Sequence, residues 1–252
     1  MLALTRSIPD SYAGALAAVP ADPPIDVALA RAQHAKYTAA LASLGAEVLT
    51  IAADEAHPDC VFIEDTAVVA GEVAVITRPG APSRQGEVAA VAAALAGRLD
   101  LHRMPPPATL DGGDCLRLGS TIYVGRSART NDIGVSFLRQ ILSNHGITVV
   151  SVPLPPEVLH LKCVCARLGD ERVLVAEGAL PDDTFGDASV VRIPAAESYA
   201  ANVLAIGSAV LCAEGFPETL AVLEAAGFKT IPLDTSEARK ADGALTCMSI
   251  LV

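Results

Sequence analysis

The feature that most constrains the fold of this chain is a weak internal repeat. Each unit contains two short apolar strands joined by a turn, an amphipathic segment that ends at a glycine, and a third strand. Three stretches follow this order closely, namely residues 65–104, 114–153 and 202–234. Units of this size cannot bury their apolar faces alone, so neighbouring units must pack against one another. The sequence therefore predicts an array of similar α/β units.

Two further units complete the array. Residues 161–178 supply a hairpin after His160, but residues 179–189 carry no helical pattern, so this unit is degenerate. The last unit combines the terminal strand CMSILV, the opening strand LALTR, a helix that ends before Gly45, and the strand EVLTIA. Joining both termini in one unit closes a ring and leaves no open sheet edge. We therefore expect a five-bladed α/β propeller whose termini close one blade, with residues 1–252 forming a single domain.

A polar residue stands at the head of each predicted hairpin. These residues are Glu64, Asp111, His160, Asn202 and Cys247, and they recur at intervals of about 45 residues. If the units surround a common axis, equivalent positions converge at one end of that axis. Two carboxylates, an imidazole, an amide and a thiol are then expected in one pocket. The competing explanation is that chain turns are generally polar.

Composition narrows the range of functions. The 252 residues are 52% apolar, which is enough for a sizeable core. No apolar stretch has the length of a signal peptide or a membrane span, so we expect a cytoplasmic protein without membrane contact. The formal charge of −11, without clustered Lys and Arg, argues against a nucleic-acid partner. A small cationic ligand fits this charge better.

No metal or cofactor is expected. Six cysteines in a cytoplasmic chain are more typical of free thiols than of a disulfide framework. Cys163 and Cys165 alternate along a strand, but no second pair of ligands lies nearby in sequence, which favours core packing over zinc. The glycines of LDGGD, at residues 110–114, lack the spacing of a phosphate-binding loop.

The hairpin heads contain the groups needed for nucleophilic catalysis. A thiol attacks as the thiolate, which a neighbouring imidazolium or a cationic substrate favours. Cys247 and His160 supply this pair, and either Asp111 or Glu64 could orient the imidazole. The remaining carboxylate would hold a cation. A guanidinium fits, because its planar N–H groups pair with carboxylates and its charge favours the thiolate.

At the level of whole motifs, the chain resembles the dimethylarginine dimethylaminohydrolases of the guanidino-group-modifying, or pentein, superfamily. The resemblance implies a five-bladed α/β propeller, in agreement with the repeat. The similar segments are collinear and cover nearly the whole chain. They are FIED (62–65), ITRPGAPSRQGE (76–87), LDGGD (110–114), SARTN (127–131), LHLK (159–162), ESYAANV (197–203) and KADGALTCMS (240–249).

The resemblance implies hydrolysis of N-omega-methylated arginine to citrulline and a methylamine. Cys247 would attack the guanidinium carbon and form a covalent thiouronium intermediate. His160 would protonate the departing amine and then activate water. Asp111 would complete the triad. Family members carry either Glu or Asp at that position, and the aspartate of this chain is one methylene shorter than a glutamate, so the hydrogen-bond geometry must compensate.

The resemblance also implies a set of substrate-binding residues. One carboxylate pair faces the guanidinium, and two arginines clamp the carboxylate of the amino acid. Three further positions line the amino-acid end through main chain or side chain. The carboxylate pair is Glu64 and Asp65, and the two arginines are Arg84 and Arg129. The positions at the amino-acid end are Leu16, Asp59 and Ala241.

Other functions stay open at this point. Arginine and agmatine deiminases of the superfamily typically carry Asp two residues after the catalytic His, where this chain has Lys162, and the chain has no room for the extra helical domain of arginine deiminases. A catalytically silent propeller used as a binding module predicts no chemical set at the hairpin heads. A cysteine peptidase lacks its flanking signature here. Three further questions stay open, namely which N-substituted arginine is preferred, whether the chain forms a homodimer, and whether residues 9–24 form a lid over the site.

Overall fold

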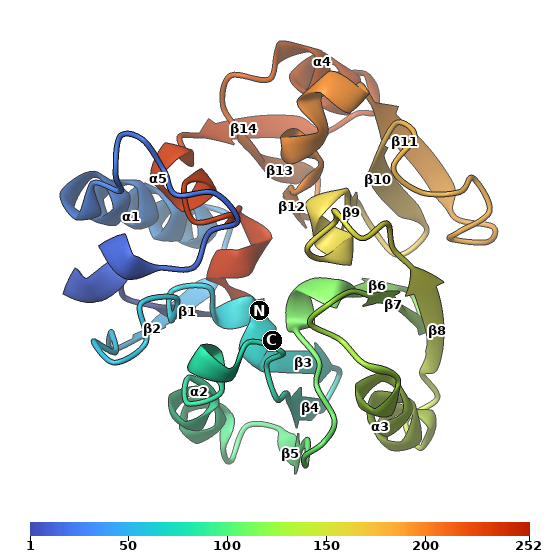
Figure 1. Ribbon diagram of the computed structural model, residues 1–252. Helices are drawn as coiled ribbons and strands as arrows, with labels where there is room; N and C mark the ends of the chain where they lie inside the picture. The colour runs from blue at the N-terminus through green and yellow to red at the C-terminus, as the bar shows by residue number, and fades with distance from the viewer.

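The computed structural model describes all 252 residues and contains five three-stranded sheets arranged as blades around an axis (Figure 1). In each blade the inner strand runs antiparallel to the middle strand, and the middle strand runs parallel to the outer one. From inner to outer, the blades are β15 (Ile250–Leu251), β1 (Leu2–Arg6) and β2 (Glu47–Ile51); β3 (Ala67–Ala70), β4 (Val73–Ile76) and β5 (Asp100–Arg103); β6 (Cys115–Leu118), β7 (Thr121–Arg126) and β8 (Thr148–Pro153); β9 (Cys165–Arg167), β10 (Arg172–Ala176) and β11 (Ser189–Ile193); and β12 (Leu204–Ile206), β13 (Ala209–Ala213) and β14 (Lys229–Leu233).

A helix connects the middle strand to the outer strand in four of the five blades. The helices are α1 (Val27–Ser43), α2 (Val88–Leu95), α3 (Asp132–Ser143) and α4 (Pro217–Ala225). In the remaining blade, turns join β10 to β11, so the unit without a helical pattern was predicted correctly. A short helix, α5 (Ser236–Arg239), follows β14.

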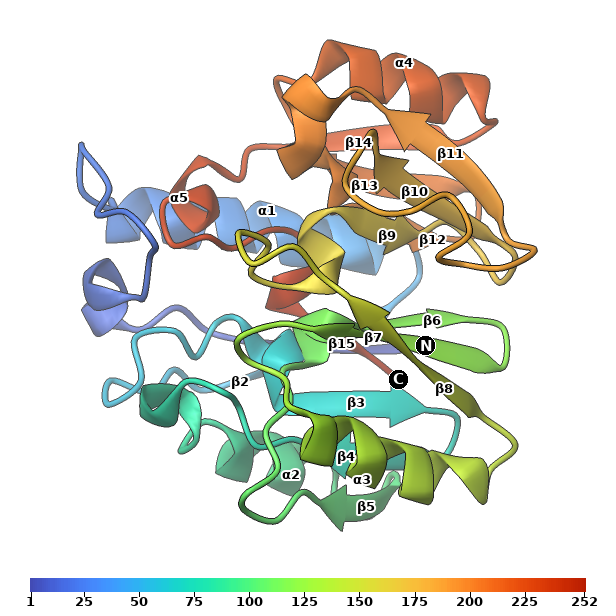
Figure 2. The same cartoon turned by 45° about the vertical axis from the view of Figure 1, so that its right-hand side comes forward.

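Short 3-10 helices introduce every inner strand. They are η2 (Ile63–Thr66), η4 (Gly112–Asp114), η5 (Leu161–Cys163), η6 (Ala195–Ala201) and η7 (Thr246–Met248), while η1 (Asp10–Gly14) and η3 (Pro82–Arg84) lie in connecting segments. The turns contact one another in succession around one end of the axis. The N-terminal segment containing η1, drawn in blue, projects beside the same end of the strands (Figure 2).

The hydrophobic core is divided among the gaps between blades. Helix α3 shows why, because its buried residues Val135, Leu138 and Leu142 fall on one face at helical spacing. They pack into a cluster with Val75 of β4 and Val124 of β7, so the helix fills the space between two neighbouring sheets. No blade can bury its apolar surface without its neighbours, which is why the repeat specifies a ring.

The two termini meet in one blade, as the sequence predicts. Leu4 of β1 pairs with Ile250 of β15, and both side chains lie in one buried cluster. Leu2 and Val252 exchange two backbone hydrogen bonds of 2.8 Å. The N- and C-termini accordingly lie side by side in both views (Figures 1 and 2).

The closing strand provides a stability test. Replacing buried Ile250 by alanine is expected to lower the free energy of unfolding by about 2–5 kcal/mol, because it leaves a cavity where the ring closes. The matched control is Ile133→Ala, whose side chain is 51% exposed, and it should change stability by less than about 0.5 kcal/mol. Equal effects in urea denaturation would contradict this account. A single cooperative transition is also expected if residues 1–252 form one domain, which stays a prediction.

None of the helices combines the length and the apolar character that crossing a membrane requires.

Candidate active site

A cavity of about 200 Å³ opens at the end of the axis where the 3-10 turns gather. It is lined by both apolar and charged side chains, from the N-terminal segment, the η2 and η5 turns, and the segment before β15. Most residues predicted to form a site line this cavity. They are Leu16, Asp59, Asp65, Arg84, Arg129, His160, Ala241 and Cys247.

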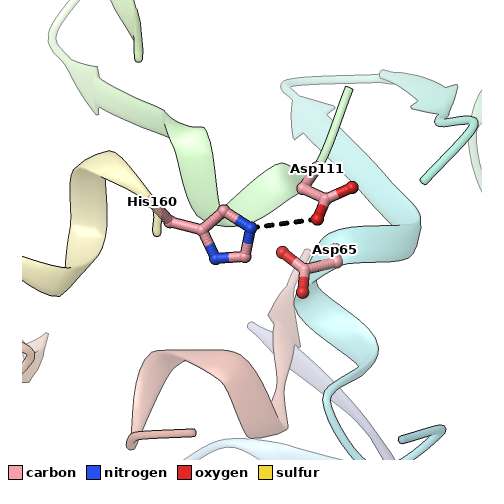
Figure 3. A group of neighbouring side chains, drawn as sticks. All are labelled: Asp65, Asp111 and His160. Carbon is pink, nitrogen blue, oxygen red and sulfur yellow. Dashed lines mark hydrogen bonds and ion pairs between the residues drawn. The ribbon is translucent and has the colours of Figure 1, made fainter. Parts of the chain in front are cut away.

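Asp111 lies behind this cavity, bonded to His160. Its Oδ2 atom is 2.9 Å from Nε2 of His160 (Figure 3). Its Oδ1 atom accepts a 2.8 Å hydrogen bond from the backbone N–H of Gly80. The backbone N–H of Asp111 donates to Oγ1 of Thr130 at 3.2 Å. The shorter aspartate is therefore held at both oxygens and at its amide. The sequence left Asp111 and Glu64 as alternatives for this place, and the structure puts Asp111 there.

The environment of His160 favours its protonated form. Burial alone would lower the pKa of His160, but the negative charge of Asp65, the hydrogen bond to Asp111 and the charge of Asp114 together raise it to about 9. Asp65, Asp111 and His160 present their polar atoms within 4.8 Å of one another. Figure 3 shows Asp65 beside the imidazole and Asp111 bonded to it. The Nδ1 atom points away from Asp111, so the ring can exchange a proton there.

A buried arginine fixes Asp65. Nη1 of Arg84 donates a 2.6 Å hydrogen bond to Oδ2 of Asp65, while Nε and Nη2 donate to the carboxylate of Glu87 at 3.0 and 2.9 Å. Nη2 also donates to the backbone carbonyl of Phe62 at 2.8 Å. Although burial opposes ionisation of Asp65, the His160 and Arg84 charges and the Gly113 N–H hold its pKa below the usual range. Asp65 is therefore a fixed carboxylate at the cavity wall.

These contacts also limit what Arg84 can offer a ligand, since only an Nη1 N–H is left without a partner. Arg129 differs, because its guanidinium lines the cavity without a hydrogen bond or ion pair to another residue. Its backbone N–H donates to Oγ of Ser127 at 3.1 Å. Of the two arginines that were expected to clamp a carboxylate, Arg129 is thus the one with a free guanidinium.

Cys247 is half-buried in η7, at the cavity wall. Burial raises the pKa of its thiol well above the ordinary value, and the nearby carboxylates of Glu64 and Asp65 raise it further. These effects disfavour the thiolate. A cationic ligand that screens the two carboxylates would reverse part of this shift in pKa.

Glu64 and Asn202 form a network beneath the cavity. The Oε1 atom of Glu64 accepts a 2.7 Å hydrogen bond from Nζ of Lys162, and Oε2 accepts one of 2.8 Å from Oγ1 of Thr246. Asn202 donates to the Lys162 carbonyl at 2.9 Å and to Thr246 at 3.0 Å. Burial raises the pKa of Glu64 despite the Lys162 charge. Glu64 lines a second, axial cavity of about 180 Å³ rather than the one with Cys247.

The N-terminal segment covers part of the cavity and is held by carboxylates. The backbone N–H of Leu16 donates to Oδ1 of Asp59 at 2.9 Å, and that of Ala18 donates to Oδ2 of Asp242 at 2.6 Å. Asp242 follows Ala241 directly, so the two sides of the cavity mouth are bonded together. The lid suggested for residues 9–24 stays a prediction.

Sequence reasoning missed several residues that hold the site together. Thr130 and Gly80 position Asp111, and Glu87 pairs with Arg84. The spacing of Arg84 and Glu87, three residues apart, was a readable sign of an ion pair. The roles of Thr130 and Gly80 carry no such sign, because both depend on contacts between separate loops.

Comparisons with known proteins identify the family. No protein-family model matches the sequence. The N(G),N(G)-dimethylarginine dimethylaminohydrolase of Streptomyces coelicolor is 40% identical to this chain over 229 residues, which is 90% of this chain and 87% of that protein. The enzyme of the same name from Pseudomonas aeruginosa is 37% identical over 229 residues, covering 89% of each.

A solved structure gives the same answer. It is a cysteine-to-serine variant of the enzyme from Pseudomonas aeruginosa, in complex with citrulline, and it superimposes with a TM-score of 0.94 at 34% identity, covering 98% of this chain and 97% of that one. The extent and level of these similarities decide the matter. The chain belongs to the dimethylarginine dimethylaminohydrolase family.

Proposed function

We propose that the chain hydrolyses N-omega-methylated arginine to citrulline and a methylamine, with Cys247 as the nucleophile. The observation that carries the proposal is one cavity lined by Cys247, His160, Asp65 and Arg129, with Asp111 bonded to the imidazole. The relatives in Streptomyces coelicolor and Pseudomonas aeruginosa bear the name of this activity. The citrulline held by the similar structure is the amino acid that this reaction would release.

The proposed first step forms a bond to sulfur. A substrate guanidinium beside Asp65 brings a positive charge to the thiol of Cys247, which loses its proton to solvent. The thiolate attacks the guanidinium carbon and forms a C–S bond. His160 donates a proton to the substituted nitrogen, the C–N bond breaks, and the methylamine leaves neutral. The enzyme then carries a thiouronium, and His160 is neutral.

The second step reverses the proton transfer. Neutral His160 takes a proton from water, and the resulting hydroxide attacks the thiouronium carbon. The C–S bond breaks and its electron pair returns to Cys247. The thiolate takes up the extra proton of the ureido group, and citrulline is released. Asp111 keeps the imidazole in place through both steps and stabilises its protonated form. One histidine can therefore act first as acid and then as base.

The amino-acid end of the substrate is assigned to the outer part of the cavity. Arg129 has the free guanidinium that a carboxylate needs, and a bidentate pair would fix the orientation of the substrate. Asp59 would attract the ammonium, with the backbone of Leu16 and Ala241 nearby. Asp65 remains at the guanidinium end, and Glu64 acts on it only through its charge. The proposed ligand is thus a small cationic amino acid. A homodimer and a cytoplasmic location stay part of the proposal.

A substrate panel tests the proposal. Citrulline should form from monomethylarginine and from asymmetric dimethylarginine. The kcat/KM for each of these substrates should be at least about 100-fold higher than the kcat/KM for agmatine. Agmatine lacks the carboxylate and therefore leaves the guanidinium of Arg129 without a partner in the cavity. The measurement is colorimetric detection of the ureido product at equal substrate concentrations. Activity confined to arginine or agmatine would refute methylarginine hydrolysis and point to a deiminase.

A further inference from the structure

Asp114 is a buried carboxylate outside the cavity that joins separate parts of the site. Its side chain is fully buried at the end of η4, three residues after Asp111. Its Oδ2 atom accepts hydrogen bonds of 2.6 Å from Oγ of Ser127 and of 2.6 Å from Oγ1 of Thr130. Its Oδ1 atom accepts one of 3.0 Å from the backbone N–H of Leu161. Three hydrogen bonds thus converge on one carboxylate.

Two of these bonds lead onward to residues of the proposed site. Oγ1 of Thr130, which donates to Asp114, accepts the backbone N–H of Asp111 at 3.2 Å. Oγ of Ser127, which also donates to Asp114, accepts the backbone N–H of Arg129 at 3.1 Å. Each hydroxyl donates its only proton to Asp114, so only its lone pairs are available to the amides of Asp111 and Arg129. We call these two chains of hydrogen bonds, from Asp111 through Thr130 and from Arg129 through Ser127 to Asp114, the two relays. The carboxylate of Asp114 therefore sets the direction of the hydrogen bonds in both relays.

The third bond holds the backbone next to the histidine. Leu161, whose N–H donates to Asp114, directly follows His160 and begins η5. The space around the carboxylate is filled, since a Cβ added at Gly125 would lie 2.7 Å from Oδ1 of Asp114 and 2.9 Å from Cβ of Leu161. The carboxylate consequently cannot shift without moving β7 or η5.

We infer that Asp114 is a positioning residue that sets the placement of His160, Asp111 and Arg129 together. The inference rests on the proposed function, because those three residues matter only if they bind and transform a substrate. A single group aligns the acid–base residue, the residue that orients it, and the residue that would bind the substrate carboxylate. The carboxylate of Asp114 thereby fixes separate loops of the third and fourth blades relative to one another.

The charge of Asp114 supports the same role. Burial raises the pKa of Asp114 to about 6, against the opposing effects of His160 and the three hydrogen bonds, so the carboxylate is ionised at neutral pH. The charged groups facing His160 are Asp65 from η2, and Asp111 and Asp114 from the η4 segment, while Cys247 of η7 lines the same cavity. Removing the Asp114 charge should therefore lower the pKa of His160.

The decisive variant is Asp114→Asn, which keeps the shape and removes the charge and one acceptor. The Asn amide nitrogen would face two hydroxyls that currently donate to the carboxylate, so one relay must reorient. We expect kcat/KM for dimethylarginine to fall by about 100-fold, because small displacements of aligned groups cost that much. The pKa of His160 should fall below its wild-type value in an NMR titration of carbon-13-labelled histidine, with His160→Gln identifying the signal.

Two milder variants separate the relays. Thr130→Ala should mainly lower kcat, because it releases the amide of Asp111, and Thr130→Ser should restore kcat. Ser127→Ala should mainly raise KM, because it releases the amide of Arg129. These variants keep the inference testable if Asp114→Asn does not fold. Unchanged kcat in Thr130→Ala together with unchanged KM in Ser127→Ala would overturn it.

The matched control is Glu197→Gln. Glu197 is a buried carboxylate that accepts two backbone N–H groups at the start of α4, 3.2 Å from Glu218 and 2.6 Å from Thr219, away from the cavity. This variant should lower the melting temperature and leave kcat, KM and the His160 titration unchanged. If Asp114→Asn shows only the same loss of stability, Asp114 is structural and the inference fails. If the wild-type protein forms no citrulline, the proposed function fails, whereas the His160 titration still decides whether Asp114 acts on the histidine.

Discussion

Replacing Cys247 by serine is expected to abolish citrulline formation from dimethylarginine, with kcat reduced by at least about 10⁴-fold. A serine hydroxyl is far less acidic than a thiol, and the two carboxylates that oppose ionisation of Cys247 would oppose an alkoxide even more strongly. Substrate binding should persist, since the variant keeps Asp65 and Arg129 in the cavity. The measurements are citrulline formation at saturating substrate and isothermal titration calorimetry of the variant with dimethylarginine.

The control for this prediction is Cys163→Ser. Cys163 is also half-buried and lies in the equivalent turn of another blade, η5, but it does not line the cavity. Its replacement should leave kcat within the error of the wild-type value. Survival of citrulline formation in Cys247→Ser would eliminate the covalent mechanism, and equal losses in both variants would show that the effect is structural.

Replacing His160 by glutamine is expected to lower kcat for dimethylarginine by about 10²–10⁴-fold, the usual contribution of a general acid–base residue. The departing amine needs a proton and the second step needs a base, and His160 would supply both. With S-methyl-L-thiocitrulline, whose methanethiolate leaves without protonation, the first step should still proceed. The variant should then accumulate a covalent adduct on Cys247, visible by intact-protein mass spectrometry.

The same residue predicts the pH dependence of the wild-type protein. Because the pKa of His160 is raised to about 9, the imidazole holds its proton at neutral pH and loses it as the pH rises through that value. The rate of amine release should therefore be sustained toward pH 9 and decline above it. In His160→Gln this decline should disappear from the residual first-step rate with the thiocitrulline substrate. A decline that persists unchanged would assign the titration to another group.

The sequence was sufficient for the architecture. The repeat predicted five units, and apolar side chains at strand and helix spacing placed the hairpins and α2 at the observed positions. It also predicted that one unit lacks a helix and that the termini share a blade. These features are readable because each depends on local periodicity, and a pseudo-fivefold ring is the arrangement that buries every unit against two neighbours.

Equivalence in the repeat, rather than any single motif, predicted that Cys247 and His160 share a cavity. Glu64 and Asn202, which head two other hairpins, were expected in the same pocket but do not line it. Cys247 and His160 stand at the heads of different hairpins, and positions that are equivalent in a ring converge on its axis. The family resemblance then connected this set with guanidinium chemistry. Neither argument specified which atoms would form hydrogen bonds, because the repeat places equivalent residues at similar heights along the axis only to within about one turn of the chain.

The hydrogen-bond partners were decided by the tertiary structure alone. His160 bonds to Asp111 while Glu64 bonds to Lys162, although both carboxylates head equivalent hairpins. Most of the N–H groups of Arg84 donate hydrogen bonds to Asp65 and Glu87. A residue that was expected to bind the substrate carboxylate therefore also holds Asp65 in position. Partner choice depends on displacements of an ångström or less between segments from different blades. Sequence periodicity fixes where a side chain starts, whereas packing between blades fixes which neighbour its polar atoms can reach.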